Sequence, residues 1–486
     1  MNDMLLLINL DIPASRAMAR KLRGEGYFCL IADCGRSLSE EITADTRGIV
    51  LCGGSEGVAA EIPGVDEILA AGLPVLAFGD AALGLCEHFG GTTVSLGQRE
   101  RPVTLSSDRQ ERLLRDIAGA ERFIPQPAAM NLPAGCRPVC WSPEGAVMGF
   151  ARNDRAVYGF AFQVESNDPE GVHLLRNFAR DICGCDAWWN DDAFIERAIG
   201  EIVETAEDGE GICAISGGVD SALCAALGAR ALGERMHCLF IDTGLLREGE
   251  ADQIMNSLSR IAGLRVQRID AQAEFLEALQ GVTGAKEKEQ IIYSRLRAHI
   301  RHEVSGRPEV RVILQGTNYS DTFSGGISLR TELTGARVRL LEPVRYLFKD
   351  EIRRVAQMLR LPEEVCKRQP FPSSGLALRI TPVVTEAHLR ELGTADRIVR
   401  EEIEAAGLNK RLWQYYASLY EYPGDNGGTV IVLRAVQAMD RGAVAARLPS
   451  DMVERMTERI LRDVPNVSRV LYDMTPSKTY RRIEWG

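Results

Sequence analysis

The sequence predicts an α/β protein, and three observations carry this prediction. Short apolar runs alternate with amphipathic stretches, and glycines follow several of the runs, as in proteins built on parallel sheets. The chain has 486 residues, of which 45% are hydrophobic and 26% charged, fractions that are ordinary for globular domains. No apolar run reaches the roughly 18 residues that a membrane span needs. At about 100–200 residues per domain, the length corresponds to two to four domains.

Charge and cysteine usage narrow the class of protein. The chain carries 68 acidic and 57 basic side chains, a net charge of -11. This balance argues against a nucleic-acid partner, because phosphate contacts require clustered Lys and Arg. The first residues have no basic flank and no long apolar core, so we expect no signal peptide. Twelve scattered cysteines then indicate reduced thiols. We expect a cytoplasmic small-molecule enzyme with no nucleic-acid or membrane partner.

The first domain is expected over residues 1–185. Its predicted strands are the apolar runs LLLIN, FCLIA, GIVLCGG and PVLAFG, and its first helix is SRAMARKLRGEG. Alternation of this kind, with glycines at strand ends, is typical of an α/β sheet. The segment CDAWWNDD reads as a linker, after which AFIERAIGEIVETAED is predicted to be helical.

A second α/β domain is expected over residues 190–380. Four apolar strands within GICAISGG, HCLFIDTG, RVQRIDA and RVILQGTNYSD are separated by helical stretches, which predicts a second parallel sheet. A small α+β domain is expected over residues 381–486. There TVIVLRAV and RVLYDM are predicted strands around the helical DMVERMTERILRDV.

The segment ICAISGGVDSALCAAL contains the most informative motif. A β-branched strand ends in a six-residue loop, and a helix begins there; the loop is Ser216, Gly217, Gly218, Val219, Asp220 and Ser221. Two glycines let the backbone fold tightly around an anion, and the helix N-terminus directs N–H groups and a positive dipole at it. The two serines add hydroxyl donors. The loop therefore predicts a pyrophosphate site, and it differs from the Walker loop because no GK[ST] follows.

SGGVDS resembles the pyrophosphate loop of the N-type ATP pyrophosphatases, and further motifs are similar to those of GMP synthases. FIDTGLLR, ILQGTNYSD, LLEPVRYLFKDEIR and RQPFPSSGLALR follow in the family's order. The ending, with VLRAVQAMDR, ARLPSD and RVLYDMTPSK, resembles the family's small C-terminal dimerisation domain. The resemblance covers nearly the whole chain. It implies a class I glutamine amidotransferase-like domain, a central ATP pyrophosphatase domain and a homodimer.

The resemblance implies a two-step ligation that uses ATP and Mg²⁺. A purine carbonyl oxygen attacks the α-phosphate of ATP, pyrophosphate leaves, and ammonia then displaces AMP. The catalytic residues implied are Lys349, near the triphosphate, and Asp220, which would also help to hold Mg²⁺. The ATP-binding positions implied, besides the loop, are Asp242, Gln315, Gly316 and Thr317. The protein's part in such chemistry is mostly positioning and charge stabilisation.

The N-terminal domain departs from the glutaminase pattern at its catalytic positions. Where the family has the nucleophilic Cys of P-V-L-G-I-C-Y-G, this chain has Gly79 in PVLAFGDA. The His position is Gln163, and the third triad residue is retained as Glu165. A thiolate nucleophile needs a sulfur and a base, and Cys86 lies beyond the turn. We therefore expect a degenerate domain without glutaminase activity, and an external glutaminase or other donor protein as a partner.

The acceptor side is a mixture of retained and altered positions. Asp321, Arg379, Lys478 and Glu484 match acceptor-binding positions, whereas the family's basic pair before Ile-Ile-Gly is replaced by Glu289 and Gln290. The substitution puts a negative charge where a nucleotide phosphate is expected. XMP is the first candidate acceptor, and a paralogue with a different nucleotide acceptor is the second possibility.

Two further interpretations are open. ATP pyrophosphatases that transfer sulfur use the same loop, and Cys366, beside the acceptor segment, is a cysteine that the family pattern does not explain. A buried structural thiol is the simpler interpretation of this residue. The second interpretation is a regulatory nucleotide binder without turnover, against which the intact loop, Asp242 and Lys349 argue.

Overall fold

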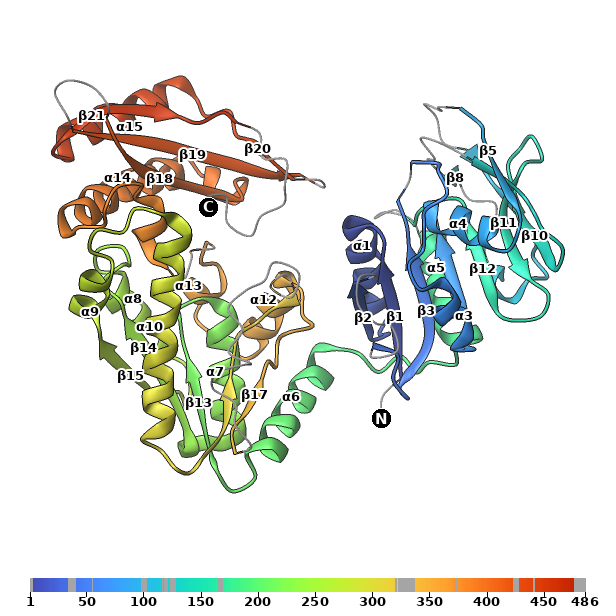
Figure 1. Cartoon of the computed structure of the whole chain (residues 1–486), viewed down its shortest axis with the longest axis horizontal. Helices are drawn as coiled ribbons and strands as arrows, with labels where there is room; N and C mark the ends of the chain where they lie inside the picture. The colour runs from blue at the N-terminus through green and yellow to red at the C-terminus, as the bar shows by residue number, and fades with distance from the viewer. Residues whose placement is uncertain are drawn as a thin grey trace. The chain divides into compact units, whose positions relative to one another are not determined.

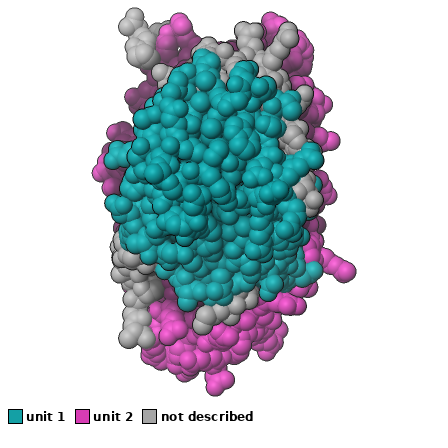
Figure 2. Space-filling view, turned by 90° about the vertical axis from the view of Figure 1, so that its right-hand side faces the viewer, with its two compact units in different colours: residues 1–193 teal, residues 194–486 magenta. Residues whose placement is uncertain are grey.

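The computed structural model of the chain divides into two compact units, residues 1–193 and 194–486, which Figure 2 colours separately. It describes residues 3–33, 41–54, 56–97, 103–115, 117, 121–122, 128–164, 169–319, 321, 337–369, 371, 374–422, 428–439 and 442–475. The α/β class predicted from the sequence is confirmed in both units. The three domain boundaries stay predictions, because the second unit contains both the expected second and third domains.

The first unit is built on a mixed sheet with the strand order β2-β1-β3-β4-β12-β11-β10-β7. The strands from β2 to β12 are parallel, and the remaining ones continue the sheet antiparallel. Their bounds are β1 Met4–Asn9, β2 Cys29–Asp33, β3 Thr46–Cys52, β4 Val75–Phe78, β7 Ser106–Ser107, β10 Cys136–Trp141, β11 Val147–Arg152 and β12 Val157–Phe160. The predicted strands are β1 to β4; the antiparallel extension was not predicted.

Helices and two small antiparallel strand pairs complete the first unit. They are α1 Ile12–Gly24, α3 Val65–Ala70, α4 Asp80–His88, α5 Pro169–Asn177, a π-helical turn at Phe178–Ile182, and the pairs β5 Thr92–Ser95 with β9 Ala128–Asn131 and β6 Val103–Thr104 with β8 Glu121–Arg122. A short 3₁₀ helix covers Arg112–Leu114. The side chain of Asp11 caps α1 by accepting a hydrogen bond from the Ala14 N–H at 2.8 Å. All of β1 is buried, as expected for a parallel strand covered on both faces.

The second unit begins with a parallel sheet of strand order β15-β14-β13-β16-β17 (Figure 1). The strands are β13 Glu210–Ala214, β14 Met236–Asp242, β15 Val266–Asp270, β16 Val310–Leu314 and β17 Arg339–Leu341. The helices are α6 Asp191–Ala206, α7 Val219–Leu232, α8 Glu250–Leu258, α9 Gln272–Ala278, α10 Ala285–Ser305, α12 Lys349–Met358 and α13 Glu363–Cys366. Short 3₁₀ helices cover Gly233–Arg235 and Gly375–Arg379. The predicted parallel sheet is confirmed, with β17 as an additional edge strand.

A second sheet and two helices form the C-terminal part of this unit. Strand β19 pairs with β18 along one edge and with β20 and β21 along the other. The elements are α14 Glu386–Ala405, a 3₁₀ helix Leu408–Lys410, β18 Gln414–Glu421, β19 Thr429–Met439, β20 Gly442–Ala445, α15 Ser450–Asp463 and β21 Val467–Tyr472. One hydrophobic core runs from the parallel sheet into this part and includes Leu245, Phe275, Leu376, Ile398 and Ile431. The two sheets therefore share buried apolar contacts.

Three further properties concern the described residues. None of the helices there has the length and apolar character that a bilayer crossing requires. The described cysteines are free thiols. Within the same ranges, no three His, Cys, Asp or Glu side chains come together as a metal site.

Candidate functional site

The candidate site of the second unit lies where the order of strands reverses. The chain runs from β13 outward through β14 and β15, then returns to the other side of β13 with β16 and β17. At such a reversal the loops that leave adjacent strands diverge, which opens a crevice at the carboxyl ends of the strands. The loops that follow β13 and β16 are Ser216–Ser221 and Gln315–Thr317, both predicted to bind ATP.

The Ser216–Ser221 loop is a compact turn at the N-terminus of α7. Gly217 has a φ of 79°, a left-handed conformation that side chains disfavour. The Ser221 hydroxyl accepts from the Ser216 N–H at 3.2 Å and donates to the Gly218 carbonyl at 3.1 Å. Within the described residues no side chain caps α7 at Gly218. The first N–H groups of the helix are therefore available to an anion.

Gly316 allows the second loop to pack against the start of α7. A Cβ atom at Gly316 would lie 2.7 Å from the Ser221 nitrogen and 2.9 Å from the Asp220 carbonyl carbon. These are backbone atoms, which cannot move out of the way by a rotamer change. The Gln315 side chain, in turn, donates to the Thr317 hydroxyl at 2.8 Å. The structure thus brings the two predicted ATP-binding segments into direct contact.

Lys349 and Asp220 form an ion pair at this junction. Lys349 is the first residue of α12, which packs against α7, and its Nζ lies 2.6 Å from both carboxylate oxygens of Asp220. The lysine side chain is 36% exposed and the aspartate side chain 9%. Lys349 and Asp220, both predicted to be catalytic, are 129 positions apart in sequence and therefore meet beside the loop only in the folded chain. The Lys349 ammonium group is partly open to solvent.

Asn318 connects the same carboxylate to Asp321. Its side-chain amide donates to Asp220 Oδ2 at 3.2 Å, and its backbone N–H donates to Asp321 Oδ2 at 3.1 Å. Both Asn318 and Asp321 are buried. Sequence reasoning did not single out Asn318, and its position between two predicted residues was the one available signal.

The side chains present do not form a magnesium site by themselves. Both oxygens of Asp220 already accept hydrogen bonds from Lys349, and one also accepts from Asn318. Mg²⁺ prefers an octahedron of oxygen ligands and usually takes several of them from water and phosphate. In this arrangement the Asp220 carboxylate pairs with Lys349 and not with a metal ion. The binding of Mg²⁺ by Asp220 stays a prediction.

Asp242 lies at the end of β14 and is occupied by protein partners. Its Oδ2 accepts from the Arg268 guanidinium at 2.5 Å and from Gln272 at 3.2 Å, while Oδ1 accepts from the Gly244 N–H at 3.1 Å. The residue is buried. It shapes the turn after β14, and its predicted contact with ATP is untested.

Arg379, predicted to bind the acceptor, lies in a buried ion cluster. Its Nη1 donates to Asp396 Oδ1 at 2.8 Å, and its guanidinium lies over the rings of Phe371 and Tyr416. Burial lowers the pKa of Arg379 to about 10, against the opposing effect of Asp396. An acceptor would have to displace the Asp396 carboxylate to reach this group. The other acceptor positions, Lys478 and Glu484, lie outside the described residues.

In the first unit, two of the positions predicted to be degenerate glutaminase residues lie at the carboxyl ends of β3, β4 and β12. Gly79 follows β4 with a φ of 56° and is the N-cap residue directly before α4. The side-chain amide of Gln163, which follows β12, donates to the carbonyls of Gly53 and Gly54 at 2.5 and 2.7 Å. Glu165, the third predicted triad position, is outside the described residues. Predicted degenerate positions 79 and 163 therefore lie together.

The space beside Gly79 is filled. A Cβ atom on Gly79 would overlap the Gly54 carbonyl oxygen and the Gln163 Nε2. Asp80 fixes the loop after β3, because its carboxylate accepts from the Glu56 and Gly57 N–H groups, both at 2.9 Å. The Gln163 amide thus occupies the place that a nucleophile side chain would require.

Neither of the two cysteines considered as reactive is activated. Cys86 is buried in α4, and burial raises the pKa of its thiol to about 11. Cys366 is 1% exposed at the end of α13, and burial raises the pKa of its thiol as well. Both side chains are therefore neutral thiols near pH 7, which are poor nucleophiles.

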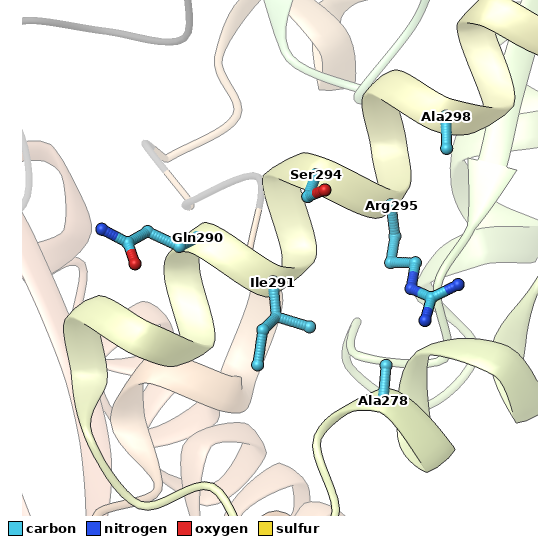
Figure 3. Close-up of a pocket in the computed structure, with 6 residues that line it drawn as sticks. All are labelled: Ala278, Gln290, Ile291, Ser294, Arg295 and Ala298. Carbon is cyan, nitrogen blue, oxygen red and sulfur yellow. The ribbon is translucent and has the colours of Figure 1, made fainter.

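A separate pocket of about 460 Å³ lies beside α10 (Figure 3). Ile291 and Arg295 point from α10 toward Ala278 at the end of α9, and Gln290, Ser294 and Ala298 complete the lining. On the same helix, Glu289 Oε1 accepts from the Tyr293 hydroxyl at 3.1 Å. None of the residues predicted to bind ATP lines this pocket.

Known families and solved structures match separate parts of the chain. The family model described as GMP synthase C terminal domain matches residues 401–485, and the one described as NAD synthase matches residues 193–387. Among solved structures, a glutamine amidotransferase from Thermotoga maritima covers 40% of this chain and 90% of its own, at 17% identity and a TM-score of 0.31. An NH3-dependent NAD synthetase from Campylobacter jejuni covers 46% and 85%, at 20% identity and a TM-score of 0.30.

Curated relatives match over the whole length. GMP synthase [glutamine-hydrolyzing] of Thermomicrobium roseum is 35% identical over 528 residues, covering 99% of this chain and 96% of the relative. The protein of the same name from Caldicellulosiruptor saccharolyticus is 32% identical over 519 residues, covering 100% and 99%. With this identity over both units, the chain belongs to the GMP synthase family.

Proposed function

We propose that this protein adenylates a carbonyl oxygen of XMP with ATP and then lets ammonia displace AMP. In the first step the carbonyl oxygen forms a bond to the α-phosphorus while the bond from that phosphorus to the pyrophosphate oxygen breaks. In the second step ammonia adds to the activated carbon, the bond from that carbon to the AMP oxygen breaks so that AMP leaves, and the nitrogen loses one proton to become an amino group. Membership of the GMP synthase family supports an ATP-dependent ligase. The meeting of Lys349 and Asp220 beside the Ser216–Ser221 loop is the observation that carries the proposal.

The residues of the site fit the departure of pyrophosphate. N–H groups at the start of α7 would stabilise the negative charge that builds up on the leaving phosphates. The Nζ atom of Lys349 is held at the same place by Asp220, so it is oriented before the substrate arrives. Preorganised groups of this kind stabilise a transition state without reorganisation.

The ammonia, in this proposal, does not come from the first unit. Gly79 supplies no nucleophile, and the Gln163 amide fills the space beside it by bonding to Gly53 and Gly54. An acyl transfer needs an activated nucleophile next to a base. Free ammonia, or a glutaminase on another protein, would then supply the nitrogen.

The test is a nitrogen-donor comparison on the purified full chain. With ATP, Mg²⁺ and XMP, we expect AMP and pyrophosphate to form in equal amounts when ammonium chloride is present. When glutamine replaces ammonium chloride, we expect AMP to form no faster than it does without any nitrogen donor. Glutamate is measured in the same reactions. Glutamate release that Gln163→Ala abolishes would overturn the donor part of the proposal. If XMP does not stimulate AMP formation and another nucleotide does, XMP is not the acceptor.

A different nucleotide acceptor is the second candidate, and Glu289 favours it. This residue stands where the family has a basic side chain, and its carboxylate is held by the Tyr293 hydroxyl. A carboxylate near a phosphate dianion is repulsive in a partly desolvated site. If XMP is not the natural acceptor for this reason, Glu289→Arg should lower the KM for XMP. Glu287→Arg, an exposed position on the same helix, is the control for net charge.

Two less favoured functions are sulfur transfer through Cys366 and nucleotide binding without turnover. The buried neutral thiol of Cys366 disfavours the first, and Cys366→Ala should leave the ammonia-dependent rate unchanged. Production of AMP with any acceptor would remove the second. We also retain a cytoplasmic location and a homodimer as proposals. Leu471 and Met474 of the C-terminal part are apolar side chains that are each 51% exposed, and a dimer contact would cover them. Analytical ultracentrifugation would measure the oligomeric state of the chain.

A further inference from the structure

A network of charged side chains connects the pyrophosphate loop with the C-terminal part of the second unit. Its members are buried or half-buried, and each is within ion-pair distance of at least one other. We call them the Asp396 network: Arg247, Glu250, Arg368, Arg379, Asp396 and Arg400. None of the six was predicted to act on ATP, and Arg379 alone was singled out in the sequence.

Asp396 is the centre of the network at its C-terminal end. It belongs to α14, is fully buried, and accepts from Arg247 Nε at 2.6 Å and from Arg379 Nη1 at 2.8 Å. Its Oδ1 also accepts from the Ala417 N–H of β18 at 3.2 Å. Burial would raise the pKa of Asp396, but the charges of Arg247 and Arg379 lower it to about 2. The carboxylate is therefore ionised and fixed between two sheets.

Glu250 and Arg368 continue the network to the loop. Glu250 Oε1 accepts from Arg247 Nη1 at 3.2 Å and from Arg368 Nη2 at 2.6 Å. The other terminal nitrogen of Arg368, Nη1, lies 3.4 Å from the Ser216 carbonyl oxygen, and a Cβ atom on Gly217 would overlap it. The guanidinium thus rests directly on the first two residues of the pyrophosphate loop.

The ring of Phe371 keeps the guanidinium groups in place. The guanidinium carbon of Arg247 is 4.1 Å from the ring centroid, that of Arg379 is 5.1 Å away and that of Arg368 is 6.0 Å away. Guanidinium groups bind aromatic faces through cation–π attraction, and a flat contact restricts their orientation. Arg368 is thereby oriented from two directions, by Glu250 and by Phe371.

The network carries an excess of positive charge. Four guanidinium groups face two carboxylates, Glu250 and Asp396, so the group has a net charge of about +2. Excess charge in a low-dielectric setting is unfavourable unless an anion is near. Arg368 is the member that touches the loop, and its side chain is 17% exposed. An anion in the loop would meet this end of the network first.

We propose that Arg368 binds the pyrophosphate that leaves ATP, and that Asp396 is a positioning residue that holds Arg368 through Arg247 and Glu250. The C-terminal part of the second unit then takes part in the ATP half of the reaction. This inference rests on the proposed function, because it assigns a further contact to the same loop.

The test measures the binding of inorganic pyrophosphate to the full chain, by calorimetry in the presence of MgCl₂. Arg368→Gln should weaken binding about 10- to 100-fold, the effect of losing a charge-assisted hydrogen bond, and Arg368→Lys should recover part of the loss. Asp396→Asn should weaken it in the same direction. Because the two act in one chain of contacts, the double variant should lose less than the product of the single losses.

Two controls separate positioning from general damage. Glu402→Gln changes a carboxylate on the same helix α14 that pairs with Arg455 and Arg459 instead, and it should leave pyrophosphate binding unchanged. If Asp396→Asn does not fold, Glu250→Gln removes the middle link and carries the same prediction. Thermal unfolding of each variant shows whether the native fold is present.

The outcomes distinguish this inference from the proposed function. Unchanged pyrophosphate binding in Arg368→Gln refutes the inference, whatever the acceptor is. Multiplicative losses in the double variant refute the role of Asp396 and leave that of Arg368. A wild-type chain that binds pyrophosphate but forms no AMP with any acceptor refutes the proposed function, while the variants still decide the inference.

Discussion

Restoring a side chain at position 79 is predicted to damage the first unit rather than revive it. Gly79 adopts a φ of 56° and donates its N–H to the Phe160 carbonyl at 2.8 Å, which fixes its backbone. A Cβ atom there would overlap the Gly54 carbonyl oxygen and the Gln163 amide. The Gly54 oxygen cannot withdraw freely, because it also accepts from the Asp80 N–H at 3.0 Å.

The magnitude follows from two separate costs. The Gly79 backbone, with a φ of 56° and a ψ of -134°, lies in a region that is adopted almost only by glycine, and it costs a residue with a Cβ atom about 1–3 kcal/mol. Overpacking of a filled site adds about 1–3 kcal/mol. We therefore expect Gly79→Ala and Gly79→Cys to lower the free energy of unfolding of this unit by about 2–6 kcal/mol. Gly72 is a control for a positive φ without crowding: its φ is 68°, and a Cβ atom there meets nothing within 4 Å. Gly72→Ala should cost only about 1–2 kcal/mol.

Urea denaturation of the full chain, followed by tryptophan fluorescence, measures the stability of all three variants. Trp141 and Trp188 lie in the first unit and report on its transition. The same preparations are assayed for glutamate release, and we expect none from Gly79→Cys or from Gly79→Cys combined with Gln163→His. If Gly79→Ala destabilises the unit no more than Gly72→Ala, or if the double variant hydrolyses glutamine, the steric argument is wrong.

Three other predictions test the second unit. Gly316→Ala should lower the Tm and weaken ATP binding, because its Cβ atom would meet the α7 backbone at 2.7 Å. Gly200→Ala, which has open space around the added Cβ atom, should instead raise the free energy of unfolding by about 0.5–1 kcal/mol. Equal Tm changes in the two variants would contradict this prediction. Lys349→Met should lower the kcat for AMP formation about 10²–10³-fold, and an unchanged kcat would exclude Lys349 from the chemistry. Folding lowers the pKa of Asp396 from 3.8 to about 2. The ionised carboxylate therefore contributes about 2 kcal/mol to the free energy of unfolding above pH 4, and this contribution is lost as the pH falls through 2. In denaturation experiments at a series of pH values, Asp396→Asn should show a shallower loss of stability between pH 4 and pH 2.

Much of the fold was predictable because parallel sheets leave a strong local signal. A strand buried on both faces must be apolar throughout, as β1 is, and a glycine turn must follow where the chain enters a helix. The antiparallel strands β10 and β11 were missed. Their side chains alternate between buried and exposed only in part, and register shifts interrupt the ladder, so the period of two is weak.

The candidate site was predictable where one segment carries the whole motif. The prediction of an anion site at the Ser216–Ser221 loop needed only the loop's own glycines and serines and the helix that follows. The arrangement around it was different, because contacts between distant segments have no local signature. Nothing near Asp396 in the sequence indicates that α14 holds Arg247, and nothing near Asn318 indicates its bond to Asp220.

The sequence by itself determined that the chain is an α/β protein, and it predicted an anion-binding loop at Ser216–Ser221 and, through the family resemblance, a glycine at the nucleophile position of a glutaminase-like domain. These are properties of apolar periodicity and of residue type, which do not depend on what lies beside them. The tertiary structure alone decided that the Gln163 amide fills the space next to Gly79, and that Arg379 is enclosed by Asp396. Steric overlap and ion pairing act between atoms that only the folded chain brings together.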